Sequence, residues 1–241
     1  MKKNMRRLMA LSLAAALALT ALTGCGGNAS SSDAMSVSTG TLAQEETSAR
    51  VGTVLLSVNP EIEMDYDDGG NVVALNALND DGRTVLAGYT GYEGRPCTAV
   101  VGELVDEIHA AGYFDTTVGG HERNIVLKLE RGSAYPTDHF LDDLATSVRI
   151  AVETDQIGSQ AVTLGQDDYD DTYGDKGYIN AAAAQNLVSA QVGRSDVQFV
   201  EKDYDLDDGD YEVEFVLDGV EYEYEVDAYT GKVKEVDIDH R

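Results

Sequence analysis

Apolar residues follow two spacings along the chain beyond its N-terminal part, and these spacings predict strands and helices. Residues 51–58 are almost all apolar, which is typical of a short strand buried on both faces. Ile62, Met64 and Tyr66 then alternate with acidic residues, which indicates a strand with one buried face. The Asp-Asp-Gly-Gly that follows has the composition of a tight turn, so residues 72–78 are predicted to return as the second strand of a hairpin.

Helical spacing occurs twice in the next part of the chain, after a second predicted turn at residues 79–82. The apolar positions of the first helix are Val100, Val101, Leu104, Val105 and Ile108. A buried strand is predicted at residues 124–129, and a second helix opens at Pro136. The apolar stripe of that helix is Phe140, Leu144, Val148 and Val152. This order of elements indicates an α+β layer with two helices on one sheet face.

The last part of the chain is predicted to be a second, smaller unit. Residues 156–177 are rich in Asp and Gly, which is typical of a solvated linker. Asn180 is a residue type that caps helices well, and it precedes an Ala-rich helix at residues 181–192. A strand at residues 197–204 and alternating strands on both sides of the Asp-Gly turn at residues 218–219 follow. We expect one helix on a four-stranded antiparallel meander.

The N-terminus has the pattern of an exported lipoprotein. Basic residues come first, and the apolar run from Leu8 to Leu22 is shorter than the ~20 residues that span a bilayer, which indicates a secretory signal. Residues 22–25, Leu-Thr-Gly-Cys, resemble the lipobox of bacterial lipoproteins, in which the Cys thiol receives a diacylglyceryl group. The resemblance implies lipidation of Cys25 and an extracytoplasmic protein anchored to the cell membrane. The alternative is an ordinary signal peptide with an incidental Cys.

The chain is therefore predicted to contain two small α+β domains, each an antiparallel-rich sheet covered by one or two helices. The predicted divisions are a signal peptide at 1–24, a flexible tether at 25–50, a first domain at 51–155, a linker at 156–177 and a second domain at 178–241.

Composition excludes several classes of function. The chain has 44 Asp and Glu against 17 Lys and Arg, a net charge of −27, which would repel nucleic acid. With Cys25 assigned to the lipid, Cys97 has no disulfide partner and is predicted to be a small buried residue. The acidic runs at residues 167–171 and 203–209 do not fit the spacing of a Ca²⁺ loop, so no metal site and no cofactor is predicted. Diffuse cation binding by the acidic surface is the weakest functional alternative.

Two stretches of the first domain carry a resemblance to a known family. Residues 56–63, Leu-Ser-Val-Asn-Pro-Glu-Ile-Glu, and residues 74–82, Ala-Leu-Asn-Ala-Leu-Asn-Asp-Asp-Gly, resemble the extracytoplasmic middle domain of RsgI-type anti-sigma factors. Members of that family also carry a cytoplasmic sigma-binding segment and a membrane helix, which this sequence lacks, so sigma-factor inhibition is not expected here. The family cleaves itself at the Asn-Pro bond of this motif, which implies Asn59 and Pro60 as the cleavage site.

Elementary chemistry allows such a cleavage. Pro60 has no backbone N–H, so the following amide nitrogen cannot attack the Asn59 side chain. The Asn59 side-chain amide can instead attack its own carbonyl carbon, which expels the Pro nitrogen and leaves a C-terminal succinimide, provided that the fold holds this geometry. Ser57 and Glu61 are candidate hydrogen-bond donors or helpers because they are neighbours. The alternative is that Asn-Pro is only a junction between strands.

The second domain resembles a PepSY domain over nearly its whole length. The resemblance rests on residues 179–181, Ile-Asn-Ala, on residues 211–215, Tyr-Glu-Val-Glu-Phe, and above all on residues 224–233, Tyr-Glu-Val-Asp-Ala-Tyr-Thr-Gly-Lys-Val. PepSY domains are associated with the regulation of extracytoplasmic peptidases and have no catalytic residues. The resemblance implies an exported protein partner, with a peptidase as one candidate.

Two functions from different classes therefore remain open. The first is an anchored binding or sensing module of the cell envelope, and the second is a self-cleaving device at Asn59-Pro60 that holds two fragments together and releases the C-terminal part. A multiple-turnover enzyme is not predicted, because the sequence has no nucleophile motif, phosphate loop or His-Cys metal spacing.

Overall fold

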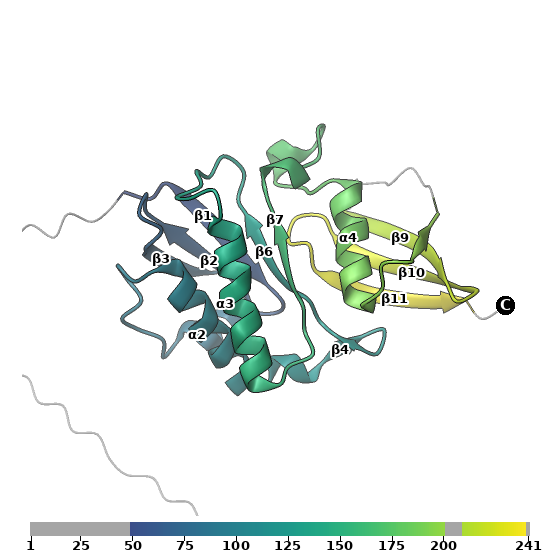
Figure 1. Cartoon of the computed structure of the whole chain (residues 1–241), viewed down its shortest axis with the longest axis horizontal. Helices are drawn as coiled ribbons and strands as arrows, with labels where there is room; N and C mark the ends of the chain where they lie inside the picture. Colours follow the sequence, from purple (N-terminus) through teal and green to yellow (C-terminus); the bar gives the residue numbers. More distant parts are fainter. Residues whose placement is uncertain (1–48, 201–208, 240–241) are drawn as a thin grey trace, which may run out of the picture. The chain divides into compact units, whose positions relative to one another are not determined.

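The structure, a computed structural model, describes residues 49–200 and 209–239 and contains two main sheets with helices beside them (Figure 1). The larger sheet has the strand order β3-β2-β1-β6-β7. Its strands are β1 (Gly52–Ser57), β2 (Glu61–Tyr66), β3 (Val72–Ala77), β6 (Ile125–Leu129) and β7 (Ala161–Leu164). The pairs are antiparallel except for β6 with β7. The prediction of an α+β fold with two sheets is confirmed.

Strand β1 lies at the centre of the larger sheet, between β2 and β6. All six of its residues are buried, as its mainly apolar sequence predicted. Val54 and Leu56 pack into the core beneath the helices, whereas Leu55 points to the opposite face and is also fully buried. A strand of this kind requires both sheet faces to be covered.

Helices α2 (Cys97–Ala110) and α3 (Phe140–Asp155) pack together and cover one of these faces (Figure 1). The predicted apolar positions of both helices are buried in this core. Helix α2 ends before Gly112, whose φ of +80° suits a glycine after a helix end. Helix α3 begins at Phe140, later than the predicted start at Pro136.

The turn predicted at residues 79–82 is wrong in part, because this stretch opens a helix. Asn79 caps helix α1 (Asp80–Leu86), and its Oδ1 accepts a 2.8 Å hydrogen bond from the amide of Gly82. Asn, Asp and Gly are common in turns and also at helix starts, so composition alone did not separate the two structures.

The second sheet is an antiparallel meander in the order β11-β10-β9-β8, as predicted. Its strands are β8 (Gln198–Phe199), β9 (Asp210–Leu217), β10 (Val220–Asp227) and β11 (Val233–Asp239). Helix α4 (Ala181–Val192), capped by Asn180, packs on the aromatic face of this sheet. The buried aromatic side chains of that face include Tyr211, Phe215 and Tyr224.

Short elements connect the longer helices and strands along the chain. They are the 3₁₀ turns η1 (Tyr113–Asp115), η2 (Gln166–Asp168) and η3 (Gly174–Lys176) and the hairpin of β4 (Thr117–Val118) with β5 (His121–Glu122). Residues 156–177, for which a linker was predicted, thus carry β7, η2 and η3. Tyr169 in this segment is buried and donates a 2.9 Å hydrogen bond to the carbonyl of Leu129.

The second face of the larger sheet packs against the smaller sheet and α4 within one compact unit. Val126 of β6 and Leu164 of β7 belong to the same apolar cluster as Leu187 of α4 and Val226 of β10. The second face of the larger sheet is therefore covered at β6 and β7.

No helix in residues 49–200 and 209–239 has the length and apolar character needed to cross a bilayer. The predicted signal peptide, Cys25 and nearly all of the predicted tether lie outside the described residues.

Candidate functional site

The Asn59-Pro60 junction connects the central strand β1 to β2. Asn59 has a φ of +84°, in the left-handed region that Asn tolerates better than most residues, and the Asn59-Pro60 peptide bond is cis. The amide of Val58 donates a 3.2 Å hydrogen bond to the carbonyl of Pro60, which closes the turn. Pro60 is buried and Asn59 is half-buried. The junction is therefore a tight, ordered turn in the sheet.

Residues at the start of α1 hold both ends of the Asn59 side-chain amide. Asn59 Nδ2 donates a 2.9 Å hydrogen bond to Asp81 Oδ2, and Asn59 Oδ1 accepts a 3.2 Å hydrogen bond from Asn79 Nδ2. Asn79 Oδ1 accepts from the backbone amides of Gly82 and of Glu61, the latter at 3.3 Å. One helix cap thus fixes both the predicted nucleophile and the residue that follows Pro60.

Two further residues, Tyr113 and Gly82, take part in the contacts of α1 near the junction. Tyr113 of η1 donates a 3.0 Å hydrogen bond from its hydroxyl to Asp81 Oδ1, the carboxylate oxygen that does not contact Asn59. A Cβ atom at Gly82 would lie 2.6 Å from the carbonyl oxygen of Glu61, so only glycine permits this approach of helix to strand.

The two helpers expected from sequence do not contact the Asn59 side chain within the described residues. Ser57 is fully buried, and its hydroxyl has no hydrogen-bond partner among the residues that the structure describes. The Glu61 carboxylate instead pairs with Lys232 Nζ at 2.5 Å. Asn79, Asp81 and Tyr113 were missed, although residues 79–82 belonged to the motif that carried the family resemblance.

A buried cation lies on the second face of the same sheet. Lys128 of β6 is fully buried, and its Nζ reaches the carbonyl oxygens of Tyr229 at 2.5 Å and Gly177 at 3.1 Å. The ammonium also lies 4.0 Å from the centre of the Tyr229 ring and 3.2 Å from Glu130 Oε1. Burial lowers the pKa of Lys128, and the Glu130 carboxylate opposes that change.

The turn that holds Tyr229 is the motif most specific to the PepSY resemblance. Asp227 Oδ1 accepts hydrogen bonds from the amides of Tyr229 at 3.0 Å and Thr230 at 2.7 Å. Burial raises the pKa of Asp227, but these bonds and the ammonium of Lys234 outweigh burial, so the net pKa is lowered. Gly231 follows with a φ of +73°. The turn is thus held by side-chain hydrogen bonds and presents the Tyr229 carbonyl and the Tyr229 ring to Lys128 of the larger sheet.

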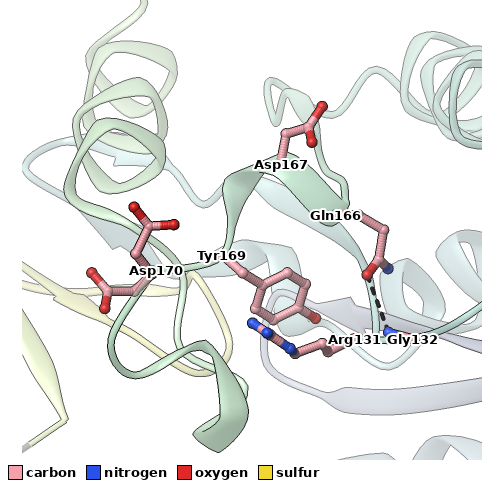
Figure 2. Close-up of a pocket in the computed structure, with 7 residues that line it drawn as sticks. Arg131, Gly132, Gln166, Asp167, Tyr169 and Asp170 are labelled. Carbon is pink, nitrogen blue, oxygen red and sulfur yellow. Dashed lines mark hydrogen bonds between the residues drawn. The ribbon is translucent and has the colours of Figure 1, made fainter.

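An open pocket of about 490 Å³ lies between the residues that follow β6 and those in and after η2 (Figure 2). Its lining residues are Arg131, Gly132, Gln166, Asp167, Tyr169, Asp170 and Asp171. Figure 2 shows the Arg131 guanidinium beside the Tyr169 ring, while the Asp167 carboxylate points away from both. Asp170 Oδ1 accepts from the amides of Thr172 and Tyr173, so this carboxylate stabilises the local turn. The pocket has no arrangement of groups that indicates a particular chemistry.

Other candidate groups are structural or isolated. Cys97 is buried and free, and burial raises the pKa of its thiol to about 12, so it is a poor nucleophile. Across residues 49–200 and 209–239, no group of three or more His, Cys, Asp or Glu is placed to hold a metal ion.

Two protein-family models match successive parts of the chain. Residues 51–172 match the anti-sigma factor RsgI-like central domain, which is half of the chain. The chain belongs to the RsgI-like central domain family. Residues 178–237 match the peptidase propeptide and YPEB domain, PepSY. No curated protein matches the chain.

The RsgI-like domain thus contains the Asn59-Pro60 junction, α1, α2, α3 and β7, and the PepSY domain contains α4 and the second sheet. Both predicted resemblances are confirmed. Domains of these two kinds are typically extracytoplasmic and regulatory, and together they support a role in signalling or regulation at the cell envelope.

Proposed function

We propose that this protein is a lipid-anchored regulator of the cell envelope that acts by binding a protein partner through its PepSY domain. The match to a family described by peptidase propeptides makes an exported peptidase the first candidate for that partner. Anchoring would keep the protein close to partners that cross or leave the membrane.

The observation that supports partner binding is the charge on the outer face of the second sheet. Along β9, Tyr211, Val213 and Phe215 are buried, so Glu212 and Glu214 point to the opposite face. On that face, Glu225 of β10 lies opposite Glu212, and Glu223 lies opposite Glu214. Lys234 Nζ lies 3.7 Å from Glu225 Oε1, yet these four glutamates give the face an excess of negative charge. Electrostatic complementarity therefore favours a partner with a basic surface.

A photo-crosslinking experiment tests this surface. A crosslinking amino acid at Glu212 in the anchored protein should capture a specific envelope protein. The double variant E214K/E223K should lose that product, because it reverses charge on the same face. The matched control D142K/D143K changes two exposed acids of α3 and should retain it. Equal capture by both charge variants, or no specific product, would count against this function.

Lipidation at Cys25 has a direct control, because the chain contains only two cysteines. Cells fed with a labelled fatty acid should label the protein and its Cys97→Ala variant, but not Cys25→Ala. The intact mass of the membrane-extracted protein should report the same lipid. An unlabelled protein in the cytosol would contradict the proposed location.

Self-cleavage at Asn59-Pro60 is a second proposed function, favoured by the hydrogen bonds that hold the Asn59 amide at both ends. Cleavage there would leave β1 on the lipidated fragment. That strand pairs with both β2 and β6 and is wholly buried, so the two fragments would stay together without a covalent bond. A partner or a pulling force could then release residues 60–241.

Denaturing electrophoresis of purified protein tests cleavage. We expect two fragments that co-migrate under native conditions, and a single intact band for Asn59→Ala. Asn76→Ala serves as a control, since Asn76 of β3 pairs with Asp65 and lies outside the junction. Fragments that persist in Asn59→Ala would indicate an external protease, and intact wild-type protein after long incubation would refute the function.

A further inference from the structure

We propose that Asp81 is the catalytic proton carrier of the cleavage at Asn59-Pro60 and that Tyr113 positions it. This inference rests on the self-cleavage function proposed above. It concerns residues that neither the sequence motif nor the family match assigns to the chemistry. The geometry that supports it is the contact between Asp81 Oδ2 and the attacking atom, Asn59 Nδ2, at 2.9 Å.

Donor and acceptor chemistry fixes the orientation of the amides in this network. An ionised carboxylate can only accept hydrogen bonds, so the Asn59 atom that faces Asp81 must be the nitrogen. Asn59 Oδ1 must then accept, and the Asn79 atom that faces it must also be a nitrogen. This leaves Asn79 Oδ1 to accept from the amides of Gly82 and Glu61, as the structure has it. Each amide therefore has one consistent orientation.

The two carboxylate oxygens of Asp81 have different partners in this network. Oδ1 accepts the 3.0 Å hydrogen bond from the Tyr113 hydroxyl, and Oδ2 faces the Asn59 amide. Both Asp81 and Asn59 are half-buried, so water competes less with this contact than on an open surface. Among the described neighbours of Asn59 Nδ2, Asp81 is the group that can accept a proton, because the Asn79 amide cannot.

The proposed step is balanced without water or a cofactor. A side-chain amide is a weak nucleophile until a base removes a proton, and Asp81 Oδ2 would take that proton from Asn59 Nδ2. A bond forms between Nδ2 and the Asn59 carbonyl carbon, and the bond from that carbon to the Pro60 nitrogen breaks. Asp81 then returns the proton to the departing Pro60 nitrogen. The products are a fragment ending in a cyclic imide and a fragment beginning with a secondary amine.

Cleavage rates of freshly translated full-length chain test this role. General acid–base groups contribute about 10²–10⁴-fold, so Asp81→Asn should slow cleavage by about that factor while keeping the side-chain volume. Asp81→Ala should be slow and should accelerate when formate is added, because the small acid can enter the space left by the side chain. Asp80→Asn is the matched control, since Asp80 is exposed and pairs with Arg83, and it should cleave at the wild-type rate.

Several results separate this role from a purely structural one. Thermal melts should show that Asp81→Asn remains folded, and Tyr113→Phe should slow cleavage less than Asp81→Asn does. In wild-type protein the two fragment masses should first sum to the parent mass, with one water gained later as the imide hydrolyses. Wild-type cleavage rates in Asp81→Asn, or no effect of formate on Asp81→Ala, would overturn the assignment of Asp81 while leaving self-cleavage itself intact. A wild-type chain that never cleaves would overturn both.

Discussion

Lys128 shows at the residue scale how the two domains are joined. Its buried ammonium group contacts the carbonyl oxygens of Gly177 and Tyr229 and the Glu130 carboxylate. Lys128→Met should lower the free energy of unfolding by about 3–5 kcal/mol, because it leaves Glu130 and both carbonyls without their cation. Urea unfolding measures this change. Adding Glu130→Gln to Lys128→Met should recover part of the loss; a single variant as stable as wild type would show that the contact contributes little.

Asp227 gives a residue-scale prediction about pH. Its folded-state pKa is lowered from the ordinary value of 3.8, so it binds a proton less readily in the folded protein than in the unfolded chain. Its stabilising contribution is therefore present above pH 3.8 and is lost as the pH falls through the folded-state pKa. At neutral pH, Asp227→Asn should cost about 1.5–3 kcal/mol, as expected for hydrogen bonds to a charged group.

The difference in the free energy of unfolding between wild type and Asp227→Asn, measured by urea unfolding, should shrink steadily as the pH falls below 3.8. A difference that stays constant over the whole acid range would mean that the charge of Asp227 does not stabilise the turn.

At the scale of elements, the close contact between α1 and the strand residue Glu61 can be tested by substituting Gly82. Gly82→Ala should destabilise the protein by about 1–3 kcal/mol, because the new Cβ would overlap the carbonyl of Glu61 and push α1 away. Helix propensity alone predicts the opposite sign, since Ala is favoured over Gly by about 1 kcal/mol. Gly88→Ala is the control, as a Cβ there meets nothing within 4 Å. Gly82→Ala should change both the thermal unfolding temperature and the cleavage rate. Gly88→Ala should change neither of them.

Elements with a strong apolar period could be predicted from the sequence, and α1 could not. Strand β2 and helix α3 each bury one regular set of side chains, so their period identified them. Helix α1 is seven residues long and buries only Gly82 and Val85, which leaves almost no period to detect. The Asn59-Pro60 junction was found through its motif, whereas Asp81 and Tyr113 reach it only through the tertiary position of α1 and η1.

At the scale of the whole molecule, the contact between the two sheets also lay beyond the sequence pattern. A lysine in a strand normally indicates a solvent-facing position, yet Lys128 is buried under the PepSY turn. The mainly apolar sequence of β1 did indicate two covered faces, but not what covers the second one. The sequence therefore predicted the two α+β folds but not the contact between their sheets.

The contact between the two domains leads to a prediction about a truncated chain. A chain that ends at residue 177 would lose α4 and the second sheet, exposing Val126 and Leu164 of the larger sheet to water. It would also leave the Lys128 ammonium without the Tyr229 carbonyl. We therefore expect this truncated protein to unfold at a clearly lower temperature than the full chain, and to bind a dye for exposed apolar surface.

Adding the separate fragment 178–241 should restore part of the stability if that fragment folds, because the contacts between the two sheets do not depend on the peptide link between them. A truncated protein that melts cooperatively at the full-length temperature would contradict this account. It would mean that the first domain is stable without the PepSY domain. The two results therefore separate two domains that fold as one cooperative unit from two domains that fold independently.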